Sequence, residues 1–144
     1  MSRFKKSVRE EVWGKFKGHC AYCGKPLKYK DMQIDHIKPK HLGGTDDIDN
    51  LFPACRRCNF YKSTFTIEKF RENVQTIPTR LMNVFIFKVG VDYGFFDNRD
   101  QKVLFYFEKV KANEYSQSEL EISKQVNEYI ESISEDTGVE FYEE

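Results

Sequence analysis

Four cysteines form two CxxC pairs, Cys20/Cys23 and Cys55/Cys58, which bracket most of the residues able to do chemistry in this chain. Zinc prefers four tetrahedral sulfur or nitrogen ligands, and each CxxC turn supplies two thiolates from a tight loop. A site that uses all four thiolates leaves no position for water or substrate, so the sequence predicts a structural zinc ion. Disulfides, a redox-active CxxC and buried free cysteines are the alternatives.

The dipeptide Asp35-His36 lies between the two pairs and suits phosphodiester hydrolysis. That reaction needs a base to deprotonate water and a cation to neutralise charge on the phosphate. Asp35 offers a carboxylate ligand, and His36 is the best-suited general base in the chain because imidazoles ordinarily titrate near neutral pH. Neighbouring residues on a strand face opposite ways, so both reach one site only if the strand ends there. The ordinary alternatives are a turn-capping aspartate and an interior histidine.

The residues after the second pair have helical spacing. Cys55, Cys58, Asn59 and Lys62 stand at i, i+3, i+4 and i+7, and therefore share one helix face. Zinc bound at the cysteines would fix this helix so that it presents Asn59 towards Asp35. Singly, however, such an asparagine is commonly a turn or N-cap residue.

The span from residue 20 to residue 63 resembles the HNH endonuclease family, with its ββα-metal core, and in particular its small phage and bacterial members. The matching segments are CAYCG at 20–24, MQIDHIKP at 32–39, GGTDDIDNL at 43–51 and CRRCNFYKS at 55–63. The resemblance implies that Asn59 is the second ligand of a single catalytic ion and that Asn50 orients the loop and His36. The family often has histidine at the position of Asn59. An amide oxygen is a hard donor, which favours magnesium or manganese.

The net charge is zero, but the charges are unevenly distributed. Residues 1–72 contain 16 Lys and Arg against 9 Asp and Glu, whereas residues 73–144 contain 7 against 14. A basic half that holds the candidate site suits DNA as a partner, although chance distribution with an acidic helix would give the same asymmetry. The candidate phosphate contacts, which could equally be ordinary surface residues, are Lys38, Lys40, His41, Arg56, Arg57 and Lys62.

The coarse pattern predicts an α+β protein, with a ββα-metal core, a structural zinc ion and a C-terminal extension of helices and a strand. Helices are predicted over residues 7–16, from 56 onward, over 66–76 and over 118–134; strands are predicted over 32–37, 50–54 and 103–107. Residues 38–45 have the composition of a loop. Pro78 is expected to end the third helix, and residues 81–93 are ambiguous, with Gly94 favouring a helix. We expect a nuclease core with its N-terminal helix at 1–65 and an extension packed on it at 66–144.

These features together predict a magnesium- or manganese-dependent HNH endonuclease that cleaves DNA, with His36 as general base. One alternative is a non-catalytic zinc-knuckle module that binds nucleic acid, for which the cysteines and the basic half suffice. Another is a protein-interaction domain centred on the acidic C-terminal helix, and truncation after about residue 112 would test it. The N-terminal residues do not combine a basic start with a long apolar run, and no long apolar stretch follows, so we expect a soluble, cytoplasmic protein with no membrane partner. The sequence leaves the oligomeric state unknown.

Overall fold

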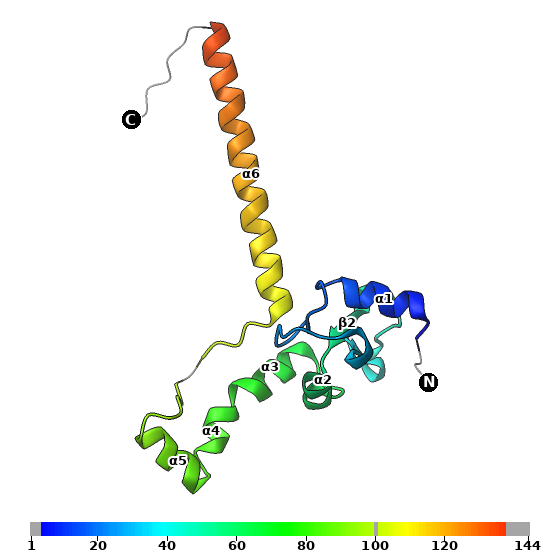
Figure 1. The fold of residues 1–144 in the computed structure, drawn as a ribbon, viewed down its shortest axis with the longest axis vertical. Coiled ribbons are helices and arrows are strands. Elements are labelled where there is room, and N and C mark those ends of the chain that lie inside the picture. Colours follow the sequence, from blue (N-terminus) through cyan, green and yellow to red (C-terminus); the bar gives the residue numbers. More distant parts are fainter. Residues whose placement is uncertain (1–3, 100, 138–144) are drawn as a thin grey trace. The chain divides into compact units, whose positions relative to one another are not determined.

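The computed structural model describes residues 4–99 and 101–137. Contacts divide the chain into two units, Met1–Phe107 and Glu108–Glu144 (Figure 1). The boundary predicted between a nuclease core and an extension at residue 65 stays a prediction. The elements in chain order are α1 (Lys6–Gly14), η1 (Tyr29–Asp31), β1 (Gln33–His36), η2 (Lys40–Leu42), η3 (Ile48–Asn50), β2 (Leu51–Ala54), α2 (Arg56–Lys62), α3 (Ile67–Gln75), α4 (Ile77–Leu81), α5 (Phe85–Asp92) and α6 (Tyr106–Thr137).

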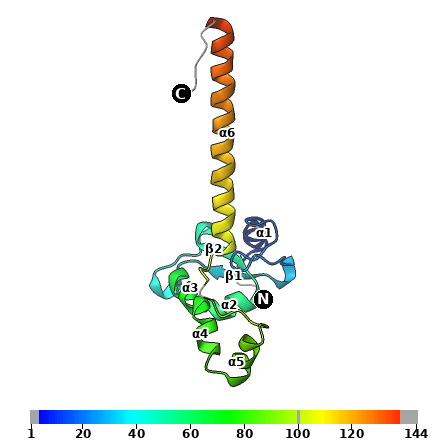
Figure 2. The ribbon, with the colours of Figure 1, turned by 90° about the vertical axis from the view of Figure 1, so that its left-hand side faces the viewer.

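The two strands form an antiparallel pair, and α2 follows β2 directly (Figure 2). The register places Asp35 opposite Phe52 and His36 opposite Leu51. All of β2 is buried, and in β1 it is Asp35 that is buried. The predicted strand, loop, strand and helix are therefore confirmed, with short 3₁₀ turns η2 and η3 inside the loop region.

α2 begins at the second cysteine pair because Cys55 is its N-cap, its sulfur accepting a hydrogen bond from the Cys58 backbone N–H at 3.4 Å. It ends at Ser63, whose φ of +51° cannot continue a right-handed helix. The helix thus comprises little more than the turn that holds Cys55 and Cys58 and the turn after it.

α1 covers β2 and is slightly shorter than the predicted span of residues 7–16. Its Val12 is fully buried in the core. The chain turns away after Gly14 through left-handed residues Lys17 and Gly18, and the Gly18 N–H donates to the Trp13 carbonyl at 3.2 Å. This turn brings the chain to Cys20.

Between residues 66 and 94 the helices differ from the predicted pattern at one boundary, the one at Pro78. α3 begins at the predicted N-cap Thr66, whose hydroxyl accepts from the Lys69 N–H at 3.2 Å. The prediction that Pro78 ends the third helix is wrong. Pro78 lies in the first turn of α4, where its missing N–H costs nothing. Gly94, with φ +76°, lies just beyond α5, which confirms that the ambiguous segment is mainly helical.

The strand predicted over residues 103–107 is wrong. Residues 103–105 have no regular structure, and α6 begins at Tyr106 rather than at the predicted residue 118. The backbone N–H groups of Tyr106 and Phe107 donate to the carbonyls of Tyr22 and Ala21 at 3.0 and 2.9 Å, so this segment is held by isolated hydrogen bonds. Within the described ranges the only sheet is the β1–β2 pair, which leaves these aromatic residues no strand partner.

The core of the first unit is largely aromatic. The Tyr22 ring packs against four phenylalanine rings at centroid distances of 5.3 to 6.4 Å: Phe52, Phe70, Phe105 and Phe107. Phe52 comes from β2, Phe70 from α3, Phe105 from the segment before α6 and Phe107 from the first turn of α6, so the core joins distant parts of the chain around the first cysteine pair. None of the helices in the described ranges combines the length and the apolar character needed to cross a lipid bilayer.

Candidate active site and metal centre

The four cysteine sulfurs converge where the turn that holds Cys20 and Cys23, called the first knuckle here, meets the start of α2. All four Sγ atoms lie within 4.8 Å of one another, and the Cys23 and Cys55 sulfurs are 3.9 Å apart. Tetrahedral zinc with Zn–S bonds of about 2.3 Å places its sulfurs ~3.8 Å apart. The cluster therefore fits zinc. Its separations are also far longer than the ~2.05 Å of a disulfide, and all four thiols are free.

Hydrogen bonds to the Cys20 sulfur favour its deprotonated form, which is the form that binds a cation. The pKa of Cys20 is lowered, chiefly because the Cys58 thiol donates to its sulfur, while burial opposes the shift. The pKa of Cys58 is raised by the same shared proton and by burial. The Cys55 backbone N–H also donates to the Cys20 sulfur, at 3.3 Å. A thiolate is therefore already favoured at Cys20, and a bound cation would displace the remaining protons.

Asp35 lies on the buried side of β1 and faces α2. It is only 6% exposed, and its Oδ2 accepts hydrogen bonds from the Tyr22 hydroxyl and from Lys62 Nζ, the latter at 2.9 Å. The ammonium of Lys62 also donates to the His36 carbonyl at 2.9 Å. Burial and the negative charge of Asp35 raise the pKa of Tyr22, which therefore remains a hydrogen-bond donor. Among the described residues, Oδ1 of Asp35 has no hydrogen-bond partner.

Asn59 stands one helical turn before Lys62 in α2. Residues at i and i+3 share a helix face, so the contact between Asp35 and Lys62 brings the carboxylate to the side of α2 that carries Asn59. The Asn59 side chain is half-buried, and its amide makes no hydrogen bond within the described part of the chain. An uncommitted amide oxygen and a buried carboxylate that contacts the same helix face are donors suited to a hard divalent cation.

His36 ends β1 and points to a different neighbour from Asp35. Its Nε2 lies 2.7 Å from Asp46 Oδ1, and Asp46 Oδ2 accepts from Lys40 Nζ at 2.8 Å. A carboxylate at Nε2 favours the tautomer with its proton on that nitrogen, which leaves the Nδ1 lone pair as a hydrogen-bond acceptor. Among the described residues, Nδ1 makes no hydrogen bond, so it is the nitrogen available to a water molecule.

Asn50 fastens the loop that carries Asp46. Its Oδ1 accepts from the Lys38 N–H at 2.8 Å, while its Nδ2 donates to the carbonyls of Lys38 and Thr45 at 3.1 and 2.9 Å. The loop also passes very close to itself, because a Cβ on Gly44 would lie 1.8 Å from the Lys38 carbonyl oxygen. Asn50 therefore holds the two ends of the loop together.

The candidate phosphate contacts separate into two groups. Five are exposed: Lys38, Lys40, His41, Arg56 and Arg57. Lys62 is completely buried, and its ammonium is bound to Asp35, so in this structure it cannot reach a phosphate at the surface. Lys62 is corrected accordingly from a surface cation to an internal counterion.

Sequence reasoning missed three contacts of Asp35 and His36. Tyr22 and the buried Lys62 bind Asp35, and Asp46 binds His36. Helical spacing did place Lys62 on the face of Asn59, but no local pattern shows that its side chain is buried. Tyr22 lies inside the first CxxC, and Asp46 is one of three acidic residues in a polar loop. Their pairing with Asp35 and His36 depends on how the two strands meet.

The fold and the cysteine cluster define a four-cysteine ββα domain of mixed helix and strand content whose thiols fit zinc. The model of the HNH endonuclease family matches residues 20–65.

The relatives of this chain include phage and bacterial proteins. The SPbeta prophage-derived "putative HNH endonuclease YoqL" of Bacillus subtilis (strain 168) is 31% identical, over 46% of this chain and 34% of that protein. The CRISPR-associated endonuclease Cas9 of Corynebacterium diphtheriae is 44% identical over 41 residues, which are 28% of this chain and 4% of that protein. The crystal structure of the type II-C Cas9 enzyme from Actinomyces naeslundii has a TM-score of 0.42 and 32% identity, covering 45% of this chain and 8% of that one. The chain thus spans about a third or less of the length of these relatives.

Proposed function

We propose that this protein is a divalent-metal-dependent endonuclease that hydrolyses DNA phosphodiester bonds. The match of residues 20–65 to the model of the HNH endonuclease family supports the nuclease class. The observation that carries the finer assignment is the contact of Asp35 with α2, because it brings a buried carboxylate to the helix face that presents Asn59. DNA as the substrate fits the basic first half of the chain.

The metal-binding roles divide between two sites. Cys20, Cys23, Cys55 and Cys58 would hold a structural zinc ion, which ties the first knuckle to α2. Asp35, through its uncommitted Oδ1, and Asn59 would hold magnesium or manganese. When bound, this ion neutralises charge that develops on the phosphate and on the leaving oxygen.

His36 supplies the general base. Its Nδ1 accepts a proton from water as the water oxygen bonds to phosphorus and one ester P–O bond breaks, and the departing oxygen takes a proton from solvent. Asp46 keeps the imidazole oriented and stabilises the positive charge that it acquires. Asn50 keeps the Asp46 loop closed on β1, so it acts through position rather than through contact with the substrate.

Lys62 supplies the positive charge that Asp35 needs while the strands and α2 are packed together. Because both Lys62 and Tyr22 bind Oδ2, the carboxylate is held with its other oxygen turned away from them. Lys62 and Tyr22 are thus positioning residues for Asp35.

Conversion of supercoiled plasmid to nicked or linear DNA tests the proposal. The zinc-loaded protein should cleave with magnesium or manganese and should not cleave when divalent ions are omitted. His36→Ala should abolish cleavage while DNA affinity and zinc content remain. If the intact protein binds DNA but cleaves it with neither ion, the non-catalytic zinc-knuckle module is the correct reading.

A further inference from the structure

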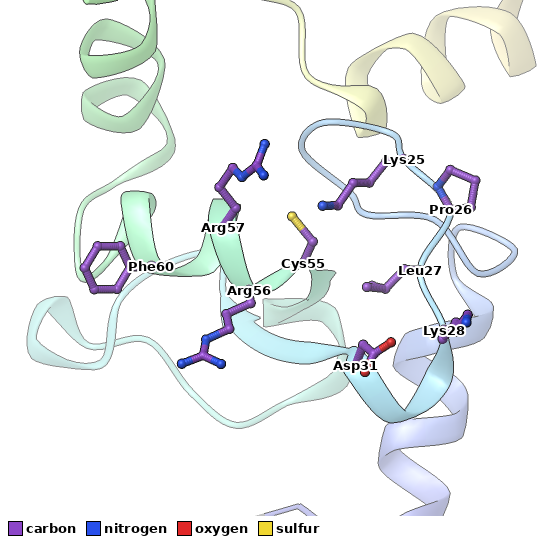
Figure 3. Close-up of a pocket in the computed structure, with 9 residues that line it drawn as sticks. All are labelled: Lys25, Pro26, Leu27, Lys28, Asp31, Cys55, Arg56, Arg57 and Phe60. Atoms are coloured by element: carbon purple, nitrogen blue, oxygen red, sulfur yellow. The ribbon is translucent and has the colours of Figure 1, made fainter.

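A basic pocket of about 570 Å³ lies beside the cysteine cluster, between the first knuckle and α2 (Figure 3). Lys25 and Lys28 border it on the knuckle side, and Arg56, Arg57 and Phe60 border it on the α2 side. Cys55 lines the pocket itself, and Lys25 follows Cys23 by two residues. The proposed zinc ion would therefore hold both walls of the pocket in place.

The cations of this pocket lack counterions. Within the described part of the chain, none of Lys25, Lys28, Arg56 and Arg57 makes an ion pair, and the only carboxylate lining the pocket is Asp31. Several cations elsewhere in the described residues do have carboxylate partners: Lys40 binds Asp46, Lys62 binds Asp35, Lys69 binds Glu72 and Arg99 binds Asp97. Four unpaired cations against one carboxylate make this pocket a site for an anion, and phosphate is the anion that a nuclease meets.

Phe60 gives the pocket a second property. Its side chain is 84% exposed, whereas the phenylalanines of the core are buried against Tyr22. It follows Arg56 by four residues and Arg57 by three, so the ring and both guanidinium groups occupy neighbouring positions on α2. An exposed ring among cations is the combination that binds single-stranded nucleic acid, in which bases stack on aromatic side chains and phosphates meet positive charge.

We propose that this pocket binds an unpaired stretch of the DNA substrate, with phosphates on Lys25, Lys28, Arg56 and Arg57 and a base stacked on Phe60. This inference rests on the proposed function, and it specifies the form of the substrate. Bases within a regular duplex are covered by their neighbours, so the ring of Phe60 has a base face to stack on only where the DNA is unpaired. Phe60 directly follows Asn59 in α2, so the stacked base and the proposed catalytic ion would lie on adjacent faces of the same helix.

Binding measurements test the proposal without requiring cleavage. Fluorescence anisotropy would measure the Kd of the zinc-loaded full chain for a labelled oligothymidine and for a blunt duplex of equal length, with no magnesium or manganese added. We expect the single strand to bind more tightly than the duplex. Phe60→Ala should weaken single-strand binding by about 5- to 100-fold, the range for loss of one stacked base. Phe60→Trp should restore it.

Matched variants separate stacking from general effects. Phe85 in α5 is 79% exposed and lies outside the pocket, so Phe85→Ala should leave the Kd unchanged. Arg56→Gln should reduce the slope of log K against log salt by about 1, as expected when one phosphate contact is lost. Zinc content measured on each variant confirms that the knuckle is intact.

Two results would overturn the proposal: equal affinity for single strand and duplex, or equal affinity of Phe60→Ala and Phe85→Ala for the single strand. Either result leaves the nuclease assignment standing if the intact protein still cleaves plasmid. Conversely, failure of cleavage with preserved Phe60-dependent binding would reject the enzyme and retain the pocket.

Discussion

Asp35 Oδ2 lies 2.9 Å from Lys62 Nζ, and the two side chains are 7% and 1% exposed. This ion pair joins the end of β1 to the last turn of α2, which are also the two elements that carry the proposed ion ligands. The contact neutralises a buried carboxylate with a buried ammonium group.

Removing the ammonium should destabilise the fold. Lys62→Met leaves Asp35 as an unpaired buried charge, so we expect the free energy of unfolding to fall by about 3–5 kcal/mol, measured by urea denaturation of the zinc-loaded protein. Lys69→Met is the matched control, because Lys69 forms an exposed pair with Glu72 and should cost less than about 1 kcal/mol. Equal losses in the two variants would show that the buried pair contributes no special stability.

The pairing of His36 with Asp46 should be visible in the rate of cleavage. Asp46→Asn removes the carboxylate at Nε2, and we expect kcat to fall by about 10- to 100-fold while zinc content is unchanged. The neighbouring Asp47 bonds to Thr45 and not to His36, so Asp47→Asn should have little effect. If the two variants cleave plasmid at the same rate, Asp46 does not orient the base.

The three hydrogen bonds of the Asn50 side chain should keep the loop between the two strands ordered. Asn50→Ala loses three hydrogen bonds, and we expect a cost of about 1–3 kcal/mol in stability and faster hydrogen exchange at the Lys38 amide. Asn50→Asp keeps the acceptor for that amide but loses both donated bonds. It should therefore preserve more of the protection at Lys38; equal exchange in the two variants would contradict the role assigned to Oδ1.

The cysteine cluster should bind one zinc ion per chain and should need it to fold. Because the thiols must lose their protons to bind zinc, acidification to about pH 5 should release the ion, and the thermal transition should move to lower temperature with it. Cys58→Ser should have the same effect at neutral pH. His19, whose Nδ1 contacts the carbonyls of Phe16 and Lys17, is the control, and His19→Ala should retain full zinc content by elemental analysis.

Phe105 should behave as a core residue although it lies outside any regular element. It is 3% exposed and stacks on Phe70 with ring centroids 5.1 Å apart. Phe105→Ala should therefore cost about 3–5 kcal/mol of unfolding free energy. Its neighbour Leu104 is 49% exposed, and Leu104→Ala should cost much less in the same denaturation assay. A cost for Phe105→Ala no larger than that for Leu104→Ala would mean that the segment before α6 is not anchored in the core.

Residue spacing alone predicted the parts of the site that depend on local geometry. Two CxxC turns oblige their thiols to lie in tight pairs, and the i, i+3, i+4, i+7 pattern obliges Asn59 and Lys62 to share a face of α2 with the cysteines. The structure confirms the two strands and the helix of the core. It does not test the catalytic roles of Asp35, His36, Asn50 and Asn59, which remain proposals.

The strand predicted at residues 103–107 failed for a physical reason. A run of β-branched and aromatic residues suits a strand only when another strand offers it a hydrogen-bonding edge. Here Phe105 fills a gap between Tyr22 and Phe70, while the next two backbone N–H groups bond to the first knuckle. Burial of an aromatic ring outweighed the intrinsic preference of the segment.

The amino-acid sequence by itself determined the match of residues 20–65 to the HNH endonuclease family and the presence of two thiol pairs, because both depend on the order and spacing of a few residue types. Only the tertiary structure decided how the charges pair. Lys62 and Asp46 carry the same formal charges in the sequence as any surface lysine or aspartate. The antiparallel register of the strands and the docking of α2 bring one against Asp35 and the other against His36, and no local pattern encodes those distances.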